Sequence, residues 1–253
     1  MLRPDFVIPF KKTKEDAIAA LKESYKGKRL LPKAFSDENR IKEIQSMYVP
    51  FWLFDARVNA AATFSAENTS RYETRDQIVT ETRHYSCKRS GEMTFRGIPV
   101  DASKRMDDNY MDSIEPFDYA ELRPFSAAYF TGHLADKYDV DVKDSLPRAD
   151  TRLTASVIGA LDSTVSGYDR TSLSGSVTIQ KAEGDVSYAM MPVWILTTNY
   201  KGKPYTFMMN GQTGKFVGSD LPEDKFKAVV YPLIPAALVF VVAVCIGWLA
   251  FDL

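Results

Sequence analysis

The chain has 253 residues, with 32 lysines and arginines against 33 aspartates and glutamates, so its formal net charge is −1. A chain this close to neutrality lacks the surplus of positive charge with which proteins hold nucleic acids. Aromatic residues make up 12% and charged residues 26% of the sequence, a composition that excludes a disordered chain. The two cysteines form no disulfide framework, and we expect both to be reduced.

Residues 1–227 predict an α+β body of antiparallel β-sheets and several amphipathic helices, with 1–103 and 104–227 as submodules. The first predicted helix covers residues 14–26. Thr13 and Asp16 have the spacing of a capping box, and apolar residues follow at helical intervals. A shorter helical turn is predicted from Ser36.

From Tyr48 onward, apolar residues recur at every second position instead of at helical intervals. Apolar and polar residues alternate over 54–64, which predicts a half-buried strand. Residues 72–87 predict a strand with one solvated face. Its hairpin partner is predicted over 93–100, after a turn at Gly91.

The predicted elements that follow are a helix over 104–114, a strand over 125–134, a helix over 144–161 and three strands of a β-meander over 174–180, 188–200 and 204–209. Pro147 lies in the first turn of the second of these helices, a position that tolerates proline. Asn210-Gly211 is a strong signal for a turn at the end of the meander.

The C-terminal segment 228–251 contains no charged residue, and 21 of its 24 residues are apolar. About 20 apolar residues in a helix cross a bilayer, so this segment predicts a transmembrane helix, with Tyr231 and Trp248 near its ends. Lys225 and Lys227 flank it on the N-terminal side, and positive residues stay on the cytoplasmic side. We therefore expect a single-pass protein of the cell membrane, with a cytoplasmic body and the lipid bilayer as a partner.

A pattern of two apolar residues, proline, an apolar residue and tryptophan occurs twice, around Pro50 and Trp52 and again around Pro192 and Trp194. One interpretation is a weak internal duplication of a small α+β unit. The simpler interpretation is that both prolines begin edge strands, where proline is common.

Candidate nucleotide and metal motifs are incomplete. The stretch from Asn210 through Gly211 and Gly214 to Lys215 lacks the first glycine and the final hydroxyl residue of a phosphate loop, which leaves these residues to a turn. Zinc needs four ligands, usually in pairs, and His84 with Cys87 has no second pair.

His133 and Asp136 are the residues with which an enzyme would carry out acid–base chemistry. No serine or cysteine nucleophile motif accompanies them, so a structural histidine is the expected role. We accordingly predict no catalytic, cofactor-binding or metal-binding residue in this chain.

Six segments together resemble one bacterial family. They are residues 1–10 (MLRPDFVIPF), 48–55 (YVPFWLFD), 99–103 (PVDAS), 112–119 (DSIEPFDY), 134–139 (LADKYD) and 210–218 (NGQTGKFVG). In this order they resemble the membrane-anchored transcription-factor-IIB-type zinc-ribbon proteins, which are often mislabelled as primosomal helicases. That family carries two Cys-x-x-Cys ribbons before the position of Met1, and this chain has no Cys-x-x-Cys. The resemblance therefore implies zinc only where such ribbons exist, and no cofactor in this chain.

The resemblance also implies protein partners, because some members of the family accompany SPFH-domain or phage-shock-A-like proteins in membrane-stress systems. We expect a non-enzymatic, membrane-anchored scaffold or adaptor that presents a cytoplasmic domain to such partners. Two alternatives stay open: a nucleic-acid-associated protein, as the family label suggests, and a hydrolase that uses His133 and nearby acids.

Overall fold

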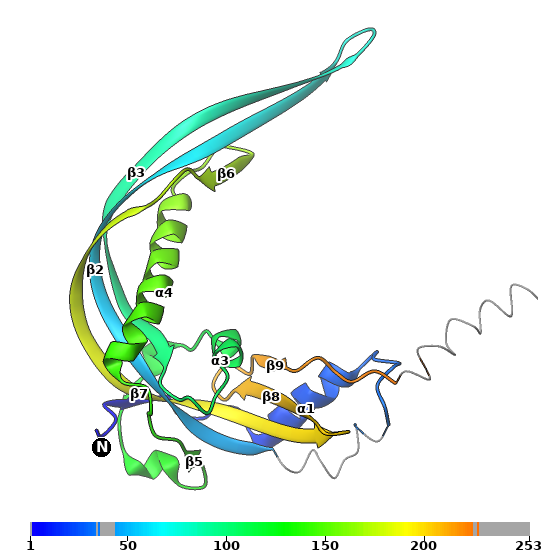
Figure 1. Cartoon of the computed structure of the whole chain (residues 1–253), viewed down its shortest axis with the longest axis vertical. Helices are drawn as coiled ribbons and strands as arrows, with labels where there is room; N and C mark the ends of the chain where they lie inside the picture. The colour runs from blue at the N-terminus through cyan, green and yellow to red at the C-terminus, as the bar shows by residue number, and fades with distance from the viewer. Residues whose placement is uncertain (1, 34, 36–43, 225–226, 228–253) are drawn as a thin grey trace, which may run out of the picture. The chain divides into compact units, whose positions relative to one another are not determined.

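The structure is a computed structural model, which describes residues 2–33, 35, 44–224 and 227 (Figure 1). Its elements are, in chain order, β1 (Phe6–Val7), α1 (Lys14–Tyr25), β2 (Gln45–Glu73), β3 (Ile78–Asp101), α3 (Asp108–Ile114), the 3-10 helix η1 (Tyr119–Glu121), β4 (Arg123–Pro124), the 3-10 helix η2 (Ala127–Phe130), β5 (Leu134–Ala135), α4 (Val142–Asp162), β6 (Arg170–Leu173), β7 (Thr178–Tyr200), β8 (Lys203–Asn210) and β9 (Phe216–Gly218).

The tertiary contacts divide the described residues into two units. Unit 1 takes in residues up to Pro9 together with Tyr48–Asp108 and Asp118–Met191. Unit 2 takes in the described part of Phe10–Met47, the short stretch Asn109–Phe117, and the described residues from Pro192 onward.

The strands of the described chain belong to one nine-stranded sheet whose central order is β3-β2-β7-β1-β4. Strand β1 pairs with β7 in parallel, with Phe6 opposite Ala189, whereas β3 pairs with β2 and β8 with β7 in antiparallel fashion. The prediction of purely antiparallel sheets is therefore wrong. The parallel pair is two residues long, too short to leave an alternating pattern in the sequence.

In unit 1 the main feature is a long antiparallel ribbon of β2 and β3. The two strands pair from Phe51 opposite Asp101 to Glu73 opposite Ile78, with one register shift just after Phe54. Helix α4 packs on β3. It buries one face through residues spaced four apart, as the 3.6-residue period requires: Ala149, Leu153, Val157 and Leu161.

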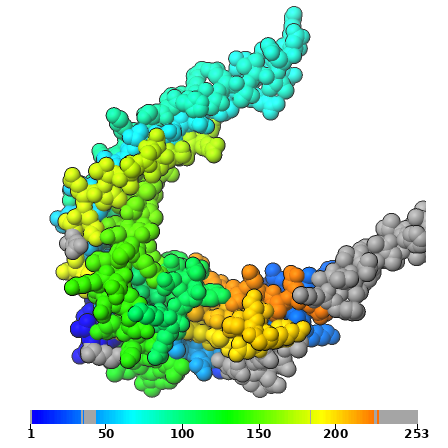
Figure 2. Space-filling view, viewed as in Figure 1, coloured from blue at the N-terminus to red at the C-terminus, as the bar shows by residue number. Residues whose placement is uncertain are grey.

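The outer part of this ribbon, residues 68–86, is called the arm below. Strand β6 pairs with β2 over Phe64–Glu67, opposite residues 84–87 of β3, and goes no further. Beyond that point the described pairings of the ribbon are those between β2 and β3 up to Glu73 opposite Ile78 (Figure 1), and Figure 2 shows this part projecting from the rest of unit 1. Several large apolar side chains of the arm are exposed: Tyr72 (51%), Ile78 (55%) and Tyr85 (39%).

The predicted hairpin turn at Gly91 is wrong. Gly91 lies inside β3, opposite Ala60, and the chain reverses at Thr74–Gln77, where the Thr74 N–H donates to the Gln77 carbonyl at 2.9 Å. Glycine is a common sign of a turn, but the observed turn at Thr74–Gln77 contains no glycine, and Gly91 is an ordinary residue of a strand.

In unit 2 helix α1 packs on the hairpin of β7 and β8. The buried residues of this core are Ala17, Leu21, Phe35, Ile44, Trp194, Leu196, Tyr205, Phe207 and Met209. The predicted capping box is confirmed, because the Thr13 hydroxyl accepts from the Asp16 N–H and the Asp16 carboxylate accepts from the Thr13 N–H. These bonds satisfy donors that the first turn of a helix leaves open.

Other predicted elements had mixed outcomes. The helix predicted over 144–161 is confirmed as α4, with Pro147 inside its N-terminal part. The helix predicted over 104–114 is shorter and begins at Asp108. The predicted strand over 125–134 is wrong, because the Ser126 hydroxyl accepts from the Ala128 N–H and starts the 3-10 helix η2 instead. The turn predicted from Ser36 lies outside the described residues.

The prediction of a single-pass membrane protein also requires correction. Within residues 2–33, 35, 44–224 and 227, no helix is both long and apolar enough to cross a membrane. The longest, α4, has 21 residues, but charged side chains such as Lys143 and Asp144 recur along it. The predicted transmembrane segment 228–251 lies outside the described residues. A transmembrane helix is therefore not part of the observed fold, and the membrane location inferred from it is withdrawn.

Candidate functional site

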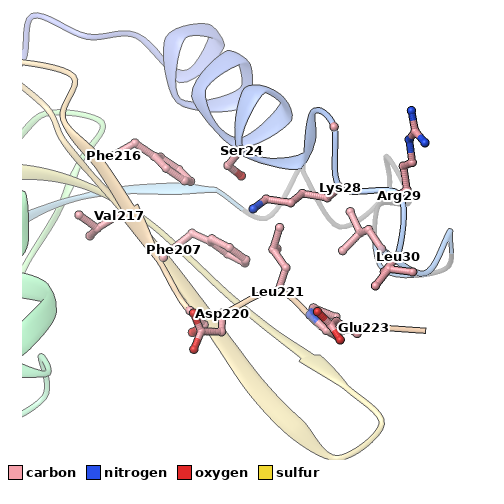
Figure 3. Close-up of a pocket in the computed structure, with 15 residues that line it drawn as sticks. Ser24, Lys28, Arg29, Leu30, Phe207, Phe216, Val217, Asp220, Leu221 and Glu223 are labelled. Carbon is pink, nitrogen blue, oxygen red and sulfur yellow. The ribbon is translucent and has the colours of Figure 1, made fainter. Parts of the chain in front are cut away.

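A hollow with a volume of about 860 Å³ lies in unit 2 of the described chain. Three stretches far apart in the sequence line it: the end of α1 with the loop through Leu31, Phe207 of β8, and the run from β9 to Glu223 (Figure 3). The loop and the last stretch are joined by a backbone bond from the Asp224 N–H to the Leu30 carbonyl at 2.8 Å. This bond joins two of the stretches that line the hollow.

Aromatic side chains form one wall of the hollow. The rings of Phe207 and Phe216 stack with centroids 6.1 Å apart and planes 17° from parallel. Gly218 allows this arrangement, because a Cβ at its position would overlap the Phe207 ring. Leu30 and Leu221 add aliphatic surface opposite the rings (Figure 3).

Charged residues of both signs lie along the rim of the hollow. Lys28 and Arg29 come from the loop after α1, and Asp220 and Glu223 come from the segment after β9. In Figure 3 the Lys28 side chain extends along the hollow, whereas the Arg29 guanidinium points away from the other labelled residues. An apolar wall with a mixed charged rim is typical of binding surfaces for proteins and other amphipathic ligands.

The hydroxyl groups that line the hollow take part in structural hydrogen bonds. Ser24 donates to the Leu21 carbonyl at 2.7 Å, within the last turn of α1. The Ser219 hydroxyl accepts from the Thr206 N–H at 2.9 Å and lies 2.8 Å from the Tyr110 hydroxyl. The described lining contains no histidine or cysteine. The bonds of Ser24 and Ser219 therefore hold the walls of the hollow together.

The two proline–tryptophan motifs occupy equivalent places in two hairpins. The Trp52 indole donates to the Val140 carbonyl at 2.9 Å, and the Trp194 indole donates to the Lys12 carbonyl at 2.9 Å. In each hairpin the proline carbonyl accepts a backbone bond from the end of the partner strand: Pro50 from Ala102, and Pro192 from Gly211. Strands β2 and β7 both have neighbours on two sides, so the edge-strand interpretation of these prolines is wrong.

These equivalent places allow the lengths of the two hairpins to be compared. Phe51 lies opposite Asp101, and Val193 lies opposite Asn210. The first pair is separated by 50 positions (101 − 51) and the second by 17 (210 − 193), so the β2–β3 hairpin is 33 residues longer. The arm belongs to this additional length.

Asn210 holds the turn after β8 in place. It is fully buried, and its side-chain oxygen accepts from the N–H groups of Gln212 and Thr213, both at 2.9 Å. Its amide nitrogen donates to the carbonyls of Ile114 at 3.0 Å and Pro116 at 3.2 Å.

The two glycines of this turn are there for different physical reasons. A Cβ on Gly211 would lie 2.6 Å from the Phe10 ring, so only glycine fits. Gly214 has a φ of 84°, in the left-handed region that glycine favours.

The candidate acid–base pair has other partners in unit 1. The Asp136 carboxylate is buried and accepts from the Ser103 hydroxyl at 2.7 Å and from Arg105 at 3.3 Å. The His133 ring packs edge-on against Tyr48 at 5.6 Å, and burial lowers its pKa. Both residues thus stabilise the loop that follows η2.

The His84 and Cys87 pair is not brought together. The residues point to opposite faces of β3, and His84 lies 3.3 Å from the Glu67 carboxylate whereas the Cys87 thiol is buried. Among the described residues, no group of three histidine, cysteine or acidic side chains is arranged to hold a metal ion.

The residues predicted to flank a membrane anchor are mostly beyond what the structure describes. Lys225, Tyr231 and Trp248 lie outside the described residues. Lys227 is described, and its ammonium group donates to the Leu31 carbonyl at 3.0 Å. The hollow itself was missed from the sequence. In the sequence, the residues of the hollow show only as two apolar dipeptides, Leu30-Leu31 and Leu221-Pro222, each with charged residues nearby.

The described residues thus form a large mixed β-sheet with three α-helices, and the hollow of unit 2 is the candidate site. A protein of Bacillus subtilis (strain 168), described as uncharacterized protein YdjG, is 36% identical to the chain over 217 residues. The match covers 86% of this chain and 63% of that protein, so the chain spans less than two thirds of the relative's length. No family model matches the chain, and no solved structure matches it.

Proposed function

We propose that the chain is a non-enzymatic adaptor that binds a segment of a protein partner in the hollow of unit 2. The observation that carries this proposal is the lining of the hollow, in which the partly exposed Phe216 ring, stacked on the buried Phe207, and leucines are flanked by charges of both signs. Aromatic and aliphatic walls supply most of the affinity of protein interfaces, and a polar rim supplies their specificity.

The backbone next to the hollow supports binding of an extended segment. Strand β9 lines the hollow and, within the described residues, pairs only with β8. A peptide that lies along β9 can form main-chain hydrogen bonds while its apolar side chains contact Phe216 and Leu221. An acidic group of the peptide can then pair with Lys28 at the rim.

A binding role agrees better with the hollow than a hydrolytic one. Ser24 and Ser219, which line it, are engaged with carbonyl or N–H groups of their own unit. A serine nucleophile requires a base within hydrogen-bond distance, whereas the hydroxyls of Ser24 and Ser219 are bonded to the Leu21 carbonyl and the Thr206 N–H.

The resemblance to transcription-factor-IIB-type zinc-ribbon proteins suggests which partners to test. SPFH-domain and phage-shock-A-like proteins from the same cell are the proposed candidates. We propose no cofactor for the chain, and zinc only for ribbons of the kind that the family carries.

The test measures the affinity of the full chain for each purified candidate by biolayer interferometry. Leu221→Asp places a charge in the hollow, where the leucine is half-buried. Losing the contact of a leucine costs about 1.5–3 kcal/mol, so we expect the dissociation constant to rise roughly ten- to hundredfold. Leu134→Asp in unit 1 is the matched control, because Leu134 is 49% exposed and lies outside the hollow.

Two results would count against the proposal. If Leu221→Asp and Leu134→Asp bind a partner equally well, the hollow is not the docking site. If neither candidate binds the unmodified chain at micromolar concentration, these partners are wrong, and the same pair of variants then tests other partners.

A further inference from the structure

The outer edge of β3 is open. In the strand order of the described residues β3 stands at one end of the sheet and pairs only with β2. An open edge presents a row of unpaired N–H and C=O groups, to which another strand can add. Proteins normally protect such edges with lysines, prolines or bulges.

Only the inner half of this edge is protected. Lys88 and Arg89 place positive charges on it, Gly97 belongs to a bulge with a φ of 68°, and Pro99 lacks an N–H group. The outer half, residues 78–86, contains no lysine, proline or glycine. Its acidic and basic residues are Glu81 and Arg83, so this stretch has no net charge when His84 is neutral.

The hairpin fixes which groups face outward. Thr74 and Gln77 form a hydrogen-bonded pair at the turn, and such pairs alternate with non-hydrogen-bonded ones along an antiparallel ribbon. The even-numbered residues of the outer half of β3, among them Thr80, Thr82 and His84, therefore direct their main-chain groups to the open edge.

We propose that the outer half of β3 pairs with the same strand of a second copy of this chain, antiparallel and with Thr82 opposite Thr82. In this register Glu81 lies opposite Arg83 of the second copy, and Arg83 lies opposite Glu81 of the second copy. Both are non-hydrogen-bonded pairs, in which side chains approach most closely. The charge pattern is thus complementary to itself under a two-fold axis.

The ion pair within each arm supports this arrangement. Glu81 and Arg83 lie on one face of β3, and the Arg83 guanidinium is 2.9 Å from the Glu81 carboxylate. The two side chains are 44% and 66% exposed. Both side chains are therefore accessible on the face of β3 where Arg83 and Glu81 of the second copy would approach them.

The apolar residues of the arm follow the same symmetry. Val79 lies opposite Tyr85 of the second copy, and Tyr72 stands beside Val79 across the hairpin. These three residues share one face of the ribbon, on which Tyr72 and Tyr85 are exposed in the single chain. Pairing brings Val79 next to Tyr85 of the second copy on this face and turns two two-stranded ribbons into one four-stranded sheet. A two-stranded ribbon alone is only marginally stable in water, whereas three or more strands with an apolar face are stable.

A cysteine scan of the edge tests the register directly in the full chain. In the proposed pair the two Thr82 residues are about 5.5 Å apart at Cα, which a disulfide can bridge. The two Thr80 residues are offset by four positions, or about 13 Å, which it cannot. In a chain that also carries Cys245→Ser, we expect Thr82→Cys to give a covalent dimer on mild oxidation and Thr80→Cys to give no more than the parent chain, whose remaining Cys87 is buried.

Sedimentation velocity of charge variants provides the second test. Glu81→Arg alone and Arg83→Glu alone should each lose the dimer, because equal charges then face each other. An equimolar mixture of the two variants should regain it, because the swapped charges are again complementary. Arg71→Glu, on the arm strand β2, is the control and should leave the dimer intact.

Three outcomes would overturn the proposal. The first is that the unmodified chain sediments as a monomer at tens of micromolar. The second is that Thr80→Cys and Thr82→Cys cross-link equally. The third is that Arg71→Glu abolishes the dimer while Arg83→Glu preserves it. The last result would assign the contact to the edge of β2. None of these outcomes bears on the hollow of unit 2, whose test uses different residues.

Discussion

Replacing Asn210 with alanine tests whether one buried side chain organises unit 2. The Asn210 amide makes four hydrogen bonds, to the Gln212 and Thr213 N–H groups and to the Ile114 and Pro116 carbonyls. Each such bond contributes about 1 kcal/mol net, and a buried group left unpaired costs about 1–3 kcal/mol. We expect Asn210→Ala to lower the free energy of unfolding by about 3 kcal/mol.

Urea unfolding followed by tryptophan fluorescence measures this loss. Thermal unfolding should shift by roughly 6–12 °C, because 1 kcal/mol corresponds to about 2–4 °C in a chain of this size. Hydrogen exchange adds a local readout, since the amides of Gln212 and Thr213 should lose their protection. Asn59→Ala is the control, because Asn59 is exposed on β2 and its loss should change stability by less than about 0.5 kcal/mol.

The reasoning fails if Asn210→Ala costs less than about 1 kcal/mol while exchange at Gln212 and Thr213 stays slow. The four bonds would then be replaceable by water or by rearrangement of the turn. A large loss of stability with unchanged exchange at those amides would show that the cost arises elsewhere, at the Ile114 and Pro116 carbonyls.

Three further predictions concern single interactions, and urea unfolding checks each. Thr13→Ala should lower the free energy of unfolding by about 1 kcal/mol, because it removes the hydroxyl that caps α1. Asp101→Ala should cost about 1–3 kcal/mol, because it removes the buried carboxylate 2.7 Å from Arg148, which keeps its second partner, Asp108, at 2.8 Å. Burial raises the pKa of Tyr188 from 10.0 to about 12, so only the unfolded chain loses this proton between pH 10 and 12. Stability should therefore fall as the pH rises through that window, and Tyr188→Phe should make the fall shallower.

The sequence predicted elements well where one face is buried. The capping residue Thr13 and the helical spacing after it located α1 to within one residue of its observed end at Tyr25. The alternation from Phe54 to Phe64 marked the inner part of β2, because every second side chain there is buried. Apolar periodicity in a sequence indicates that one face of an element is buried, and both α1 and the inner part of β2 have one buried face.

The same argument explains why the arm was not recognised as one ribbon. From Thr69 to Glu73 every residue of β2 is exposed, so the alternation that marks a strand disappears although the strand continues. Its pairing partner in β3 has no fully buried residue over 78–82, and no glycine marks the turn between them. What holds these residues extended is their pairing with one another, which local sequence patterns do not record.

The hollow could not be predicted from the sequence, for a different reason. Its walls come from segments almost 200 positions apart, around Leu30 and around Leu221, and neither segment carries a known motif. The residues with recognisable chemistry, His133 and His84 among them, are instead engaged in packing and in a surface ion pair. Motifs identified reactive residue types, whereas the candidate site depends on how ordinary apolar residues are brought together.

The comparison of the two hairpins bears on the purpose of the arm. The β7–β8 hairpin shows that a proline–tryptophan strand can pair, end at a buried polar residue and pack on a helix within 17 positions from Val193 to Asn210. The β2–β3 hairpin satisfies the same contacts near Trp52, so its 33 additional residues are not needed to form them. Ordering those residues costs conformational entropy, and the arm recovers little of it through burial within its own chain. Residues that a fold orders without burying are best explained by a contact with another molecule, and the self-complementary edge at Glu81 and Arg83 identifies a second copy as that molecule.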